Sequence, residues 1–74
     1  MSATSLRDLR SKAKKLSESL PYLLEINKEP RKDVCWVIRN NGMKGSDVIF
    51  AGSASECESY LMGMEEALRA LFTY

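Results

Sequence analysis

The sequence of 74 residues contains no histidine. That absence removes the commonest general base near neutral pH and the commonest metal ligand, and with them every Ser-His or Cys-His nucleophile. No glycine-rich loop with G-x-G-x-x-G spacing or a G-K-[ST] ending is present. Four carboxylates near the C-terminus, Glu56, Glu58, Glu65 and Glu66, are expected to form a solvated helix face. We therefore expect no enzyme, no cofactor and no metal site.

Cysteine is also scarce, and long apolar runs are missing. Cys35 and Cys57 are too few for a disulfide framework and match no zinc spacing, so we expect two buried, reduced thiols. No apolar run approaches the ~20 residues needed to span a bilayer, and the first ten residues lack an apolar signal region. These absences predict a cytoplasmic protein without a membrane segment, folded as one domain over residues 1–74.

Charge is nearly balanced overall but unevenly placed. The net charge is +1, yet residues 1–44 hold ten Lys/Arg against five Asp/Glu. Residues 45–74 hold one Arg against five acids. The sequence therefore predicts a basic N-terminal part and an acidic C-terminal part.

The first predicted element is an amphipathic helix over residues 5–19. Apolar residues recur there at spacings of three and four, as expected for one helix face: Leu6, Leu9, Ala13, Leu16 and Leu20. Ser5 and Asp8 form a helix-start signal, and Pro21 ends the helix.

Three strand candidates follow. Residues 22–26 are compatible with an edge strand or with one more helical turn, and we favour the edge strand. Residues 34–39 are rich in β-formers and apolar on both faces, which predicts a central strand. The loop containing Asn41-Gly42 leads to a returning strand at residues 47–51, so the pair is predicted to form a hairpin.

The segment from Ser53 onward predicts a second helix. Two capping boxes mark its start, Ser53 with Glu56 and Ser55 with Glu58. Its apolar stripe comprises Cys57, Tyr60, Leu61, Met64, Ala67, Leu68 and Leu71. We expect Leu61 and Leu68 to contact Trp36 and the first helix. The predicted fold is α+β, in the order α-β-β-(β)-α, with both helices on one face of a short antiparallel sheet.

Gly63 lies within this helix and aligns with Ser59 and Ala67 as a smooth strip, with Met62 and Ala70 beside it. One interpretation is that the first helix packs closely against this strip. The other is that a second copy or a partner protein does so, and we expect a homodimer formed in this way.

Basic residues suggest a different kind of surface. The first helix and the following connection carry Arg7, Arg10, Lys12, Lys14, Lys15, Lys28, Arg31 and Lys32. Such residues bind phosphates when they share one surface. Acidic residues interleave with them, however, and the pI of about 7.7 is low for a nucleic-acid-binding domain. Nucleic acid is therefore a possible partner that we do not favour.

The predicted topology resembles that of double-stranded RNA-binding domains, although their basic start of the last helix is replaced here by the acidic "SASECES". The segment "WVIRNNGMKGSDVIFAGSASECESYLMGMEEAL", about half of the chain, is similar to the hairpin and helix of small phage-type domains, including the arm-DNA-binding module of phage integrases. It carries their E-x-x-x-[YF]-L pattern from Glu56 to Leu61. Of the basic residues that those modules place on their strands, Arg39 and Lys44 are present. The resemblance implies a small accessory protein of a phage or mobile element.

Together these patterns predict a small non-enzymatic protein-binding module, of the kind that inhibits or regulates a host protein. The alternative is a nucleic-acid-binding regulator that uses the basic first helix and the Arg31-Lys32 region.

Overall fold

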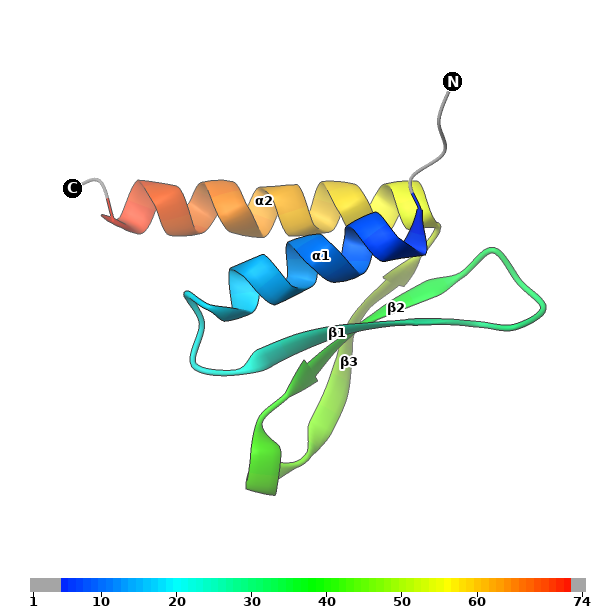
Figure 1. Ribbon diagram of the computed structural model, residues 1–74, viewed down its shortest axis with the longest axis horizontal. Helices are drawn as coiled ribbons and strands as arrows, with labels where there is room; N and C mark the ends of the chain where they lie inside the picture. The colour runs from blue at the N-terminus through cyan, green and yellow to red at the C-terminus, as the bar shows by residue number, and fades with distance from the viewer. Residues whose placement is uncertain (1–4, 73–74) are drawn as a thin grey trace.

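The computed structural model describes residues 5–72, which form two helices and a three-stranded antiparallel sheet (Figure 1). The elements are α1 (Leu6–Ser17), β1 (Leu23–Lys28), β2 (Cys35–Asn40), the single 3-10 turn η1 (Gly42–Lys44), β3 (Ser46–Gly52) and α2 (Ala54–Phe72). Both helices lie on the same side of the sheet. The predicted α+β fold is confirmed, in the order α-β-β-β-α.

The strand order in the sheet is β1-β2-β3. The segment at residues 22–26, left open between strand and helical turn, is therefore an edge strand that begins at Leu23. The predicted central strand is β2, and it forms the expected hairpin with β3. Val37 pairs with Phe50 whereas Ile38 pairs with Val48, so Ile49 forms a β-bulge in β3. Gly42 and Gly45 supply the positive φ angles that the hairpin loop needs.

Helix α1 starts where the sequence predicts, because the Ser5 hydroxyl accepts a hydrogen bond from the Asp8 N–H at 3.1 Å. It ends at Ser17, two residues earlier than expected. There the Ser17 hydroxyl donates to Ala13 O at 2.7 Å and accepts from the Leu24 N–H of β1 at 2.8 Å. The last turn of α1 is thus joined directly to the first edge of the sheet.

Helix α2 uses the first of its two capping boxes. The Ser53 N–H donates to Glu56 Oε1 at 2.9 Å, and the Glu56 N–H donates to Ser53 Oγ at 3.2 Å. The hydrogen bond from the Ser53 backbone N–H to the Glu56 carboxylate, and next the Ser53 side chain, lower the pKa of Glu56. Ser55 and Glu58 lie inside the helix, so the second capping box is not used.

The core lies between the sheet and the helices, and the buried residues in the described part of the chain are Leu9, Ala13, Leu16, Leu24, Ile26, Cys35, Val37, Cys57 and Leu61. The expectation of two buried, reduced thiols is confirmed. The Cys57 thiol donates to Cys35 O at 3.4 Å, and burial raises the pKa of Cys57. A buried thiol with a raised pKa is a poor nucleophile.

The expected contact of Leu61 and Leu68 with Trp36 is wrong. Leu61 is buried and Leu68 packs against the core as a half-buried residue. Trp36, however, alternates along β2 with the buried Cys35 and Val37, so its side chain points to the opposite face of the sheet. The far end of the predicted stripe also lies outside the core, since Ala67 and Leu71 are exposed.

Candidate functional site

The sheet face that points away from the helices is the first candidate site. We call it the open face. Its side chains lie in three cross-strand rows, because residues that pair across strands share a face. The rows are Asn27–Trp36–Ala51, Glu25–Ile38–Val48 and Leu23–Asn40–Ser46.

Five of the nine residues of the open face are apolar, and only one is charged. Leu23 is 59% exposed, Val48 54% and Trp36 36%. These three side chains alone present on the order of 300 Å² to solvent, comparable with the largest apolar patches of monomeric proteins. Glu25 is the one charged residue of the nine, although 28% of the whole chain is charged. A sheet face exposed to water ordinarily carries alternating polar residues, so the exposed Leu23, Trp36 and Val48 make this face a candidate for contact with another molecule.

Both edges of the sheet are protected against lateral pairing. On the β1 edge, the Ser17 hydroxyl accepts from the Leu24 N–H and Arg10 Nε donates to Ile26 O at 3.2 Å. On the β3 edge, the bulge at Ile49 interrupts the strand. Covered edges and bulges both prevent the addition of a further strand. Addition of a further strand at either edge is therefore disfavoured.

The strip on α2 is a second exposed surface. Ser59, Gly63 and Ala67 are exposed, as are Met62 and Ala70 beside them. A Cβ added at Gly63 would meet no described atom within 4 Å beyond its chain neighbours and the adjacent backbone of α2. The interpretation that α1 packs against this strip is therefore wrong, because α1 lies on another side of α2. Contact with a second copy or a partner stays a prediction.

The open space around Gly63 gives a stability prediction. Gly63→Ala is expected to raise the free energy of unfolding by about 0.8–1 kcal/mol, because alanine has the higher helix propensity and meets no obstacle. Urea denaturation followed by circular dichroism measures the change. Ser59→Ala, one turn earlier and also exposed, is the control and should gain less. A loss of stability in Gly63→Ala would show that the site is crowded in solution.

Lys15 lies on a different side of α1 from Arg10 and Lys14. Arg10 bonds to β1, and Lys14 lies beside Leu23 and Glu25 at that same edge. Lys15 instead lines the cleft against α2, on the other side of α1. Neighbouring helix positions point about 100° apart, which explains the division. Arg31 and Lys32 lie exposed in the turn between β1 and β2, and Arg7 and Lys12 are further along α1 from Lys15.

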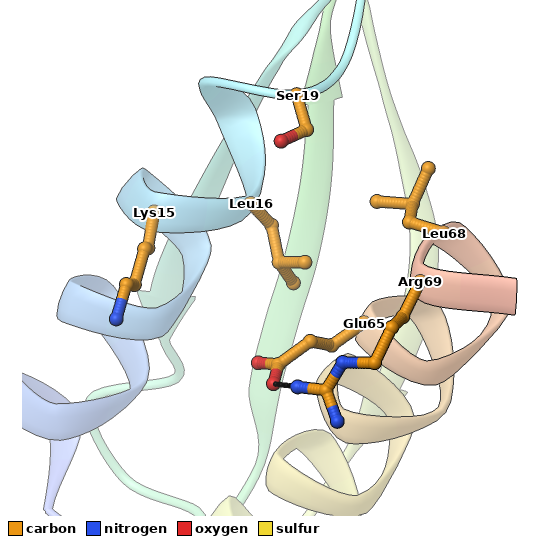
Figure 2. Close-up of a pocket in the computed structure, with 6 residues that line it drawn as sticks. All are labelled: Lys15, Leu16, Ser19, Glu65, Leu68 and Arg69. Carbon is orange, nitrogen blue, oxygen red and sulfur yellow. Dashed lines mark hydrogen bonds and ion pairs between the residues drawn. The ribbon is translucent and has the colours of Figure 1, made fainter. Parts of the chain in front are cut away.

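A cleft of about 300 Å³ lies between the C-terminal halves of α1 and α2 (Figure 2). Leu16 and Leu68 form its apolar part. Arg69 donates to Glu65 at 3.0 Å along its rim, and Lys15 extends away from this pair. Within residues 5–72 no buried side-chain polar atom lacks a hydrogen bond. The cleft therefore has no buried polar group that awaits a ligand.

A scan against protein-family models found no match, and searches of curated proteins and of solved structures found none either. In the part of the chain that the structure describes, no group of three or more metal-ligating side chains occurs. Neither described helix has the length and apolar character to cross a membrane. The site must therefore be interpreted from its own geometry.

Sequence reasoning did not identify the open face. The available signal was the strand at residues 34–39, whose two faces are both apolar. Only one of those faces is covered by helices, and the other carries Trp36 and Ile38.

Proposed function

We propose that this protein is a non-enzymatic binding module that docks onto another protein surface through its open face. The observation that carries the proposal is the exposed apolar surface around Trp36, with a single charge among nine outward-facing residues. Docking of this kind covers a surface on the partner, which is how a small inhibitor or regulator acts.

The arrangement of the face fits that of a binding surface. Cores of protein interfaces are depleted in charge and enriched in aromatic residues, and tryptophan is a frequent energetic centre. Trp36 lies on the central strand between Asn27 and Ala51, two smaller side chains that leave the indole accessible. Asn27, Asn40 and Glu25 supply polar groups around the apolar residues.

The test is capture of a partner by the immobilised protein from a cell lysate. Wild type should retain a protein even in high salt, because apolar contacts are not screened. Trp36→Ala should reduce retention by at least about tenfold, the effect of losing an interface centre. Met62→Ala removes another half-exposed large side chain, on α2, and should retain the partner. Equal retention by the Trp36 variant and wild type would refute the proposal.

The salt dependence of binding in the same experiment distinguishes protein binding from the alternative, nucleic-acid binding. Binding of nucleic acid by α1 and the Arg31-Lys32 turn would weaken steeply as salt rises. It would also depend on Lys12, Lys14 and Lys15, replaced together by Gln. If the protein retained only nucleic acid, and this binding were both salt-sensitive and lost in the lysine variant, the nucleic-acid-binding function would be favoured. Lys14 and Lys15 lie on different sides of α1, which is the reason to prefer protein.

A further inference from the structure

We propose that the open face binds a second copy of this chain, sheet against sheet, in a two-fold symmetric dimer. This inference rests on the proposed protein-binding role of the face and names its partner. It places the contact on the sheet and not on the strip of α2. Four steps carry it: the position of the single charge, the apolar area, the protection of the edges and the small size of the domain.

The position of Glu25 selects the symmetry axis. With the two-fold axis across the strands, Glu25 of one chain would face its copy at the distance between packed sheets, about 10 Å. With the axis parallel to β2, Glu25 on β1 instead faces Val48 on β3 of the second copy. The two Glu25 residues are then offset sideways by two strand spacings as well as by the distance between the sheets, so they lie roughly 14 Å apart. The repulsion between the two carboxylates is therefore weaker than with the axis across the strands.

The same axis joins the apolar residues. Trp36 lies opposite the Trp36 of the second copy and Ile38 opposite its Ile38, because both are on the central strand. Leu23 faces Ser46, and Asn27 faces Ala51. Aligned sheets of this kind pack with an angle near −30° between their strands. The centre of the interface is therefore aromatic and aliphatic, and its polar residues lie toward the margins.

The area predicts a weak dimer. Two open faces bring together roughly 600 Å² of apolar surface from Leu23, Trp36 and Val48 alone, and the margins raise the total toward ~1,000 Å², the lower limit for a specific interface. Self-association is a common way for domains of this size to gain stability. We therefore expect dissociation constants in the micromolar range.

The protected edges make the assembly close at two copies. Ser17 and Arg10 occupy the β1 edge, and the Ile49 bulge interrupts the β3 edge. In a two-fold contact each chain's open face is covered by the other chain, so no third copy can bind through that face. The helices α1 and α2 of both chains then form the outer layers of the dimer.

Sedimentation equilibrium and tryptophan fluorescence test the inference. The mass should rise from the monomer's 8.4 kDa to twice that value over micromolar concentrations. Trp36 is the only tryptophan in the chain, so its emission should shift to the blue over the same range. Val48→Glu should weaken association by on the order of 100-fold, because it brings an unpaired carboxylate against Glu25 of the second copy. Val48→Lys should stay within about tenfold of wild type, since it faces that same carboxylate.

Three results would overturn the inference. The first is a mass of 8.4 kDa at every concentration, and the second is equal dimerisation of Val48→Glu and wild type. The third is loss of the dimer in Met62→Glu, which would place the contact on α2. A monomer that still captures a different protein through Trp36 would retain the proposed function and refute the dimer. A monomer without such capture would refute both.

Discussion

Leu61→Ala is expected to leave much of the protein unfolded near body temperature. Leu61 is 1% exposed and lies in the core cluster with Leu9, Val37 and Cys57. Truncation of a buried leucine costs about 2–5 kcal/mol, through lost burial and the cavity left behind. A single core of this size contributes roughly 3–5 kcal/mol in net stability. The loss is thus comparable with everything that holds the fold together.

Thermal and urea denaturation followed by circular dichroism measure this effect. Leu71→Ala is a matched control, because the same residue type on the same helix is 71% exposed there. Its stability should stay within about 0.5 kcal/mol of wild type. Leu68→Ala should fall between the two, since Leu68 is half-buried at the margin of the core. If Leu61→Ala and Leu71→Ala behaved alike, α2 would not be docked on the sheet.

Ser17→Ala is expected to have the second large effect, although the residue is polar and small. The substitution removes two hydrogen bonds, to Ala13 O and from the Leu24 N–H. The Leu24 N–H of an edge strand is then left without its partner, which costs about 1–3 kcal/mol. The variant also frees part of the β1 edge, so we expect it to aggregate more readily than wild type.

Hydrogen exchange of the Leu24 amide measures the local effect. Exchange should be faster in Ser17→Ala than in wild type, and by more than the global loss of stability explains. Ser19→Ala is the control, because the Ser19 side chain is exposed two residues further on. A Leu24 amide that stayed fully protected in Ser17→Ala would mean that the serine does not cover this edge in solution.

The elements of this fold could be predicted because their signals are local. The spacing of Leu9, Ala13 and Leu16 identifies α1, and Ser53 with Glu56 identifies the start of α2. The hairpin follows from its loop glycines. Each signal lies within a few residues of the element that it defines, so a single sequence is sufficient to read it.

The candidate site could not be predicted in the same way, because it depends on contacts between distant segments. The strand at residues 34–39 is apolar on both faces, and the sequence does not tell which face the helices cover. The bond from the Leu24 N–H to Ser17 joins a helix end to a strand across a turn and has no sequence signature. Gly63 is compatible in the sequence with close packing of α1 or of another molecule, and only the structure shows that α1 is not its neighbour.

The order of the strands in the sheet also bears on how rapidly the chain folds. Each strand pairs with the strand next to it in sequence, and no connection crosses the sheet. Segments that pair in this way need to close only short loops before their contacts form, and proteins with such local pairing fold on timescales of about milliseconds. The core residues that the two helices cover, such as Val37 and Leu61, are consequently exposed in partly folded chains only briefly.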